Sequence, residues 1–128
     1  MRIVVYGRSL GAAIAADLVS KNASQALILE AAFTSLPDAG QDIYPLFPVK
    51  QFSKFHYDTL NKLKLIHCPV LIVHSRDDRL IPFHHAQSLY EAVTGRKEFI
   101  EIGGPHKGNY QPTLQKYRDG VKRFLSSL

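Results

Sequence analysis

Val4-Val5-Tyr6-Gly7-Arg8-Ser9-Leu10-Gly11-Ala12-Ala13 is the part of this 128-residue chain that indicates its fold most clearly. It passes from an apolar strand to an apolar helix within three residues, and a serine occupies the turn between them. The flanking glycines are expected to let the backbone turn and to let the helix pack closely against the strand. A serine held in this way lies at the carboxyl end of a sheet, beside the N–H of Leu10 and the start of the helix. Ser9 is therefore the candidate nucleophile.

Length and composition predict one globular domain over residues 1–128, with 45% hydrophobic and 21% charged residues. The single cysteine, Cys68, cannot form an internal disulfide, which is compatible with a reducing compartment. No stretch reaches the length of a membrane span, and no separate hydrophobic segment with a cleavage site begins the sequence. These features predict a cytoplasmic protein.

The basic residues give a formal net charge of +5 but are spread along the chain without an aromatic-interleaved basic motif. Nucleic acid is therefore not an expected partner. The densest basic stretch, residues 50–67, carries four lysines against Asp58. It is either a solvated face or a patch that attracts anionic lipid or substrate.

Apolar patterning predicts four strands that alternate with helices. The expected strands cover residues 2–6, 26–30, 70–74 and 97–102. The expected helices cover residues 10–21, 58–65, a segment between 82 and 95, and a last segment opened by Pro112. Residues 33–57 form a loop-rich excursion with short helical pieces. The first strand and first helix are apolar on every side and are expected to be buried all round. The alternation predicts an α/β fold with a four-stranded parallel sheet flanked by helices.

Polar residues that can carry chemistry follow three of these strands, where the loops of an open parallel sheet gather reactive groups. Ser9 follows the first strand, Asp77 and Asp78 the third, and His106 the fourth. A serine nucleophile needs a neutral imidazole as base, and the base needs an acid that fixes its tautomer. Alone, Asp78 is a turn residue or helix cap and His106 a loop histidine. Together with Ser9, they predict a catalytic triad that needs no cofactor.

Two other kinds of site have weaker support in the sequence. His84 and His85 are adjacent, so they are expected to project in different directions, and no metal site is predicted. Gly7 and Gly11 with Glu30 imitate a dinucleotide-binding turn and its ribose-binding acid. A dinucleotide-binding turn would have a glycine at the position of Ser9, and this interpretation leaves the third and fourth loops without a role.

Four segments, taken in order, resemble the last four strand-and-loop units of the serine α/β-hydrolases, and together they span nearly the whole chain. These segments are residues 7–11, 28–35, 74–82 and 103–106. The resemblance is closest to the esterase and acyl-thioesterase-like branch that includes membrane-tethered protein depalmitoylases. It implies that Ser9 is the nucleophile, Asp78 rather than Asp77 the acid, and His106 the base. The implied substrates are small-molecule or lipid-like acyl esters or thioesters, cleaved through an acyl-serine intermediate.

The resemblance also implies a truncated domain, the C-terminal half of an eight-stranded fold. The first strand here corresponds to the fifth strand of the family. The loop after the third family strand, which supplies one of two oxyanion N–H donors, would be missing. The N–H of Leu10 would remain, and loss of one donor costs on the order of 100- to 1,000-fold in turnover. A weakly active enzyme and a non-catalytic, hydrolase-like fragment or interaction module are therefore alternatives.

Two further expectations follow from this implied half fold. The outer edge of strand 2–6 has no expected partner, which predicts a homo-oligomer or a complementing N-terminal half at that edge. Phe47, Phe52 and Phe55 in the loop-rich excursion either roof an apolar acyl site or pack as ordinary core residues.

Overall fold

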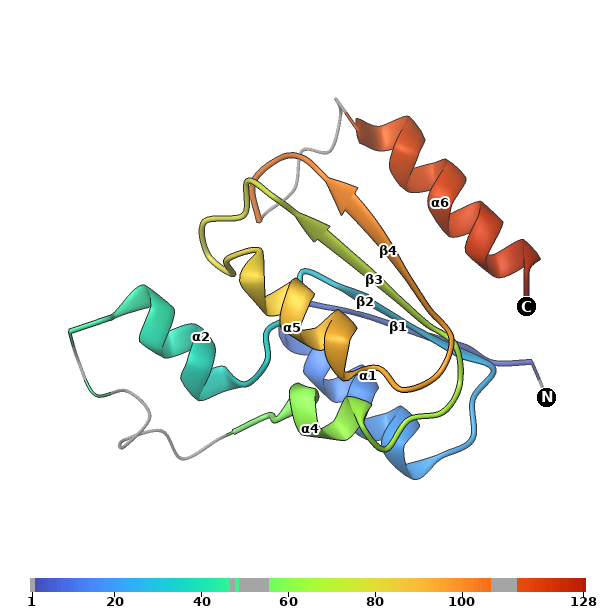
Figure 1. Ribbon diagram of the computed structural model, residues 1–128, viewed down its shortest axis with the longest axis horizontal. Helices are drawn as coiled ribbons and strands as arrows, with labels where there is room; N and C mark the ends of the chain where they lie inside the picture. Colours follow the sequence, from blue (N-terminus) through green and yellow to red (C-terminus); the bar gives the residue numbers. More distant parts are fainter. Residues whose placement is uncertain (1, 47, 49–55, 107–112) are drawn as a thin grey trace.

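A computed structural model describes residues 2–46, 48, 56–106 and 113–128, and four parallel strands form its sheet (Figure 1). The strands are β1 (Val4–Arg8), β2 (Ala26–Glu30), β3 (Val70–Ser75) and β4 (Lys97–Ile102). They lie side by side in chain order, β1-β2-β3-β4. The register places Arg8 opposite Glu30 and His74 opposite Glu101. The predicted α/β fold with a four-stranded parallel sheet is confirmed.

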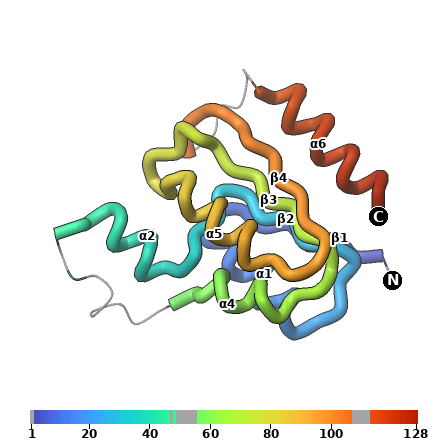
Figure 2. Tube along the Cα trace, in the orientation of Figure 1, coloured from blue at the N-terminus to red at the C-terminus, as the bar shows by residue number. Residues whose placement is uncertain are grey.

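Helices cover both faces of this sheet. They are α1 (Leu10–Lys21), α2 (Leu36–Ile43), α4 (Thr59–Leu63), α5 (His84–Ala92) and α6 (Leu114–Ser126). Helices α1, α4 and α5 pack on one face and α6 on the other, while α2 stands to the side of these layers (Figures 1 and 2). Each parallel pair of strands is therefore joined through a helical segment, as crossover connections require.

The core has two layers because successive side chains of a strand point to opposite faces. Leu27 and Leu29 of β2 face α1, α4 and α5, and join a cluster with the alanines of α1. Ala26 and Ile28 of the same strand face α6, where they pack in a second cluster around the fully buried Phe124. The central strands β2 and β3 are buried along their whole length.

The expected all-round burial of the first strand and first helix is wrong. The strand covers residues 4–8 rather than 2–6, and Tyr6 is 51% exposed. Leu10, Ile14 and Leu18, spaced by four residues on α1, are 46%, 57% and 49% exposed. Only the small side chains on the opposite side of α1 are packed against the sheet. The reason is that β1, within the described part of the chain, pairs with β2 alone and has an uncovered outer edge.

Other boundaries differ slightly from the sequence expectation. Strand β3 extends to Ser75, α4 is shorter than residues 58–65, and α5 ends before Gly95. In the part of the excursion that the structure describes, the one regular helix is α2, whose N-terminus is capped by the Ser35 hydroxyl oxygen accepting the N–H of Asp38. Pro112, Phe47, Phe52 and Phe55 lie outside the described residues. Among the described helices, none combines the length and apolar character needed to cross a bilayer.

Candidate active site

Ser9 lies in the tight turn that joins β1 to α1. Its φ of 55° and ψ of −122° place a non-glycine residue in a region that L-residues seldom adopt. The turn is held by the main chain: the Ser9 N–H donates to the carbonyl of Glu30 at 2.9 Å, and the Ser9 carbonyl accepts the N–H of Ala12 at 3.0 Å. The neighbouring strand β2 and the first turn of α1 therefore position the serine through its backbone.

The two glycines that flank Ser9, each two positions away, differ in what the structure requires of them. A Cβ at Gly7 would lie 2.3 Å from the carbonyl oxygen of Gly11 and 2.7 Å from atoms of Ala12 and Ala15. A Cβ at Gly11 would meet no heavy atom of the described residues within 4 Å. Gly7 is therefore required for close packing of α1 on β1, while the positive φ of the turn belongs to Ser9 itself.

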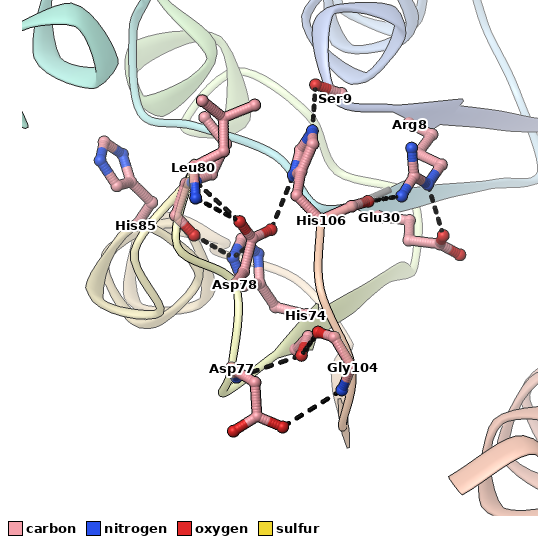
Figure 3. Close-up of polar contacts among 12 residues, drawn as sticks. Arg8, Ser9, Glu30, His74, Asp77, Asp78, Leu80, His85, Gly104 and His106 are labelled. Atoms are coloured by element: carbon pink, nitrogen blue, oxygen red, sulfur yellow. Dashed lines mark hydrogen bonds and ion pairs between the residues drawn. The ribbon is translucent and has the colours of Figure 1, made fainter. Parts of the chain in front are cut away.

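His106, in the loop after β4, connects the serine to an aspartate. Its Nε2 lies 3.0 Å from Ser9 Oγ, and its Nδ1 lies 2.7 Å from Asp78 Oδ2 (Figure 3). Because the carboxylate is an acceptor, the ring hydrogen is placed on Nδ1, and Nε2 keeps a lone pair that accepts the serine hydroxyl. The structure thus brings together the three residues that the sequence selected, in an arrangement suited to proton transfer from serine to histidine.

Asp78 is buried and fixed in its loop by main-chain donors. Its Oδ1 accepts the N–H groups of Leu80 and Ile81 at 2.9 and 2.8 Å, which leaves Oδ2 directed at His106. His74 of β3 lies beneath it, with Nε2 3.7 Å from Asp78 Oδ2 and 2.8 Å from the carbonyl oxygen of Ile81. Burial lowers the pKa of His74, so the ring is neutral and donates to Ile81. The sequence analysis assigned no role to His74, which lies near the end of β3 and four residues before Asp78.

Asp77 performs a different task from its neighbour. Its Oδ2 accepts the N–H of Gly104 at 3.1 Å, and the Ser75 hydroxyl donates to the Gly104 carbonyl. Gly104 has a φ of 98°, so this turn favours glycine. Ser75, the last residue of β3, thus helps to hold the loop that carries His106.

Leu10 is the first residue of α1, and the first N–H groups of a helix have no acceptor within the helix. Its N–H follows Ser9 directly, which is the position expected of an oxyanion donor. Glu30, in contrast, is only 2% exposed, and its carboxylate accepts hydrogen bonds from Arg8, Tyr6 and Tyr117. It is therefore not available to a ribose, as a dinucleotide site would require.

The expectation that His84 and His85 project in different directions is wrong. Their rings stack with centroids 4.4 Å apart, and both Nε2 atoms approach Asp42 Oδ2, at 3.0 and 2.5 Å. Oxygen and imidazole ligands of this kind suit a metal ion such as zinc. However, the N–H of Thr34 donates to His85 Nδ1 at 3.0 Å, which places the ring hydrogen on Nε2. In this tautomer His85 donates to Asp42 and offers no lone pair to a metal.

Comparisons with known proteins extend these observations. No protein-family model matches the chain. An uncharacterized protein of Mycobacterium tuberculosis is 32% identical in an alignment 128 residues long that covers 98% of this chain and 45% of that protein. The lysophosphatidylserine lipase ABHD12 of Rattus norvegicus is 31% identical over 120 residues, covering 78% of this chain and 30% of the lipase. The Pyrococcus furiosus esterase Pf2001 superposes with a TM-score of 0.76 at 23% identity, over 98% of this chain and 54% of the esterase.

The chain therefore spans about half, or less, of the length of the proteins that it matches. The solved structures show the fold, and the similar lipase sequence agrees with it. Together with the parallel sheet and the serine turn, these matches show that the chain has part of an α/β-hydrolase-like esterase fold.

Proposed function

We propose that this chain is the nucleophile-bearing part of a serine hydrolase that cleaves carboxylic esters or thioesters. The observation that carries the proposal is the continuous hydrogen-bonded path from Ser9 Oγ through the His106 ring to the buried Asp78 carboxylate. The positive φ of Ser9, at the junction of a strand and a helix, is the backbone geometry that such a nucleophile requires.

The reaction follows from the protonation of the His106 ring. As Ser9 Oγ attacks the acyl carbonyl carbon, Nε2 takes the hydroxyl proton, and Asp78 stabilises the resulting imidazolium. Collapse of the tetrahedral intermediate expels the alcohol or thiol, which receives that proton, and leaves an acyl ester on Ser9. Water then attacks the acyl carbon with His106 again as base, which releases the carboxylic acid and restores the serine. The N–H of Leu10 donates to the oxyanion in both steps.

The similar proteins support this reaction class. One is named as a lipase and one as an esterase, so both names describe the cleavage of carboxylic esters. Thioesters present the same acyl carbonyl to the serine, and their thiol is a good leaving group. The substrate of this chain is therefore proposed to be a small-molecule or lipid-like acyl ester or thioester.

The uncovered side of β1 supports a partner in the reaction. Leu10, Ile14 and Leu18 form an exposed apolar face of α1, the helix that follows β1, and in the described part of the chain β1 pairs with β2 alone; we name this apolar face, with the outer edge of β1, the β1–α1 face. The mycobacterial protein and the Pyrococcus esterase each have about as many residues again outside the aligned part. The proposed occupant of the β1–α1 face is that remaining part of the hydrolase fold, on the same or on another polypeptide, and it is also the proposed source of a second oxyanion donor.

The nucleophile is tested with a fluorophosphonate probe, which labels activated serines. Wild-type chain is expected to be labelled and Ser9→Ala not. Ser126→Ala, which changes a serine at the far end of α6, is the matched control and should keep wild-type labelling. Labelling that persists in Ser9→Ala would overturn the assignment of the nucleophile. A folded wild-type chain that is never labelled would instead favour the non-catalytic alternative.

A further inference from the structure

Arg8, the residue between Gly7 and Ser9, joins two parts of the site that lie far apart in the sequence. Its Nε donates to Glu30 Oε2 at 3.0 Å, and its Nη2 donates to the backbone carbonyl of His106 (Figure 3). The guanidinium therefore lies between a strand-end carboxylate and the main chain of the candidate base.

Glu30 is a rigid support for this arginine. Its side chain is 2% exposed, and Oε1 accepts the hydroxyl hydrogens of Tyr6 at 3.1 Å and Tyr117 at 2.6 Å. Burial and the neighbouring carboxylate raise the pKa of Tyr6 to about 12 and raise that of Tyr117 as well. Both hydroxyls therefore stay protonated at neutral pH and keep donating. A buried carboxylate held by several donors has little freedom to move.

The same glutamate also holds the serine. The Glu30 carbonyl accepts the N–H of Ser9, while its carboxylate holds Arg8, which reaches His106. Glu30, at the end of β2, thus holds the backbone of Ser9 directly and the backbone of His106 through Arg8. These are the two residues whose side chains meet in the contact between Ser9 Oγ and His106 Nε2. A shift of about 1 Å in such a contact can cost about 100-fold in rate.

We infer that Arg8 is a positioning residue: anchored on Glu30, it fixes the main chain of His106 and so aims the imidazole at Ser9. The inference rests on the proposed function. Arginine suits this task because its planar fork donates in two directions at once, whereas a lysine ammonium is a single point of charge. The His106 side chain is held by Asp78 and its main chain by Arg8, so the two contacts together define the direction of the ring.

The test compares Arg8→Gln, Arg8→Lys and Glu30→Gln with a matched control, Arg76→Gln. Arg76 also pairs with a glutamate through its Nε, but it lies in an exposed pair with Glu101. The Arg8 and Glu30 variants are expected to react with the fluorophosphonate probe about 10- to 100-fold more slowly than wild type. For a short-chain ester, kcat should fall while KM stays nearly unchanged. The double variant Arg8→Gln/Glu30→Gln should be labelled no more slowly than Arg8→Gln alone. Both substitutions interrupt the same series of contacts, from Glu30 through Arg8 to His106.

Hydrogen exchange supplies a measurement that does not depend on activity. In Arg8→Gln, peptides covering residues 103–106 should exchange faster, while peptides of β3 keep their wild-type protection. Arg76→Gln should leave the exchange of both regions unchanged. Wild-type labelling rates together with unchanged loop exchange in Arg8→Gln would overturn the inference. If the wild-type chain itself is not labelled, the proposed reaction fails, and loop exchange still decides whether Arg8 holds the His106 loop.

Discussion

Asp78 accepts the Nδ1–H of His106 at 2.7 Å, and this one contact decides which ring nitrogen faces Ser9. Its neighbour Asp77 instead holds the amide of Gly104. Two adjacent carboxylates of the same loop thus act on different parts of the His106 segment, one on the ring and one on the main chain.

The two aspartates should therefore differ sharply when each is replaced. Asp78→Asn offers an amide that favours the wrong imidazole tautomer, so turnover should fall by on the order of 10³- to 10⁴-fold. Asp77→Asn keeps an oxygen that can accept the Gly104 N–H and should cost less than about 10-fold, as a single neutral hydrogen bond suggests. Steady-state hydrolysis of a chromogenic ester measures both. Equal losses for the two variants would contradict the assigned roles.

Alanine at Gly7 and at Gly11 should have opposite effects on stability. The new Cβ at position 7 would lie 2.3 Å from a backbone oxygen, and relief of such overpacking costs about 1–3 kcal/mol. Position 11 is helical and open among the described residues, so Gly11→Ala should stabilise by roughly 0.5–1 kcal/mol. Urea unfolding followed by circular dichroism gives both free energies. A destabilised Gly11→Ala chain would show that this position carries a constraint beyond local packing.

Because two histidines are buried, the free energy of unfolding should be lower at mildly acidic pH than at neutral pH. Burial lowers the pKa of His74 and of His85 below the ordinary value of 6.5. As pH falls through that value, the unfolded chain takes up protons that the folded chain does not, so the free energy of unfolding decreases. Urea titrations at neutral and mildly acidic pH should show this loss, and His74→Gln should reduce its slope. His67→Gln, which changes an exposed histidine, should leave the slope as it is.

The β1–α1 face should make the isolated chain associate. Exposed apolar side chains beside an unpaired strand edge favour pairing with another molecule. Sedimentation velocity at micromolar concentration should show dimers or larger species, and Ile14→Lys/Leu18→Lys should return the chain to a monomer. Leu125→Lys is the control, because Leu125 is also 44% exposed but lies on α6. A monodisperse wild-type monomer would contradict association through this face.

The sequence predicted the four strands well because apolar runs and the turn residues between them are local signals. The order of Ser9, Asp78 and His106 was also informative, since parallel strands bring their carboxyl ends to one edge. The burial of α1 was not predictable in the same way. Leu10, Ile14 and Leu18 are residues suited to a covered helix, and a pattern cannot tell which surfaces a given stretch of chain actually covers.

Side-chain contacts between residues far apart in the sequence could not be predicted either. Glu30 was interpreted only as a possible ribose-binding acid, whereas its partners Arg8, Tyr6 and Tyr117 come from two other elements of the fold. The stacked pair His84 and His85 is explained by Asp42, which lies more than 40 residues earlier in the chain. No spacing rule links such positions, because side-chain packing in three dimensions decides them.

The sheet order has a consequence for how the molecule opens when heated. Strand β3 is paired on both sides and buried along its length, while β1 is paired on one side in the described part and half-exposed. Local opening begins where burial and pairing are least, so β1 should detach before the centre of the sheet. Ser9 leaves with β1, whereas Asp78 follows β3, which is paired on both sides. The proposed nucleophile and its acid are thus carried by a labile strand and a stable one, and they should separate at a temperature below that of global unfolding.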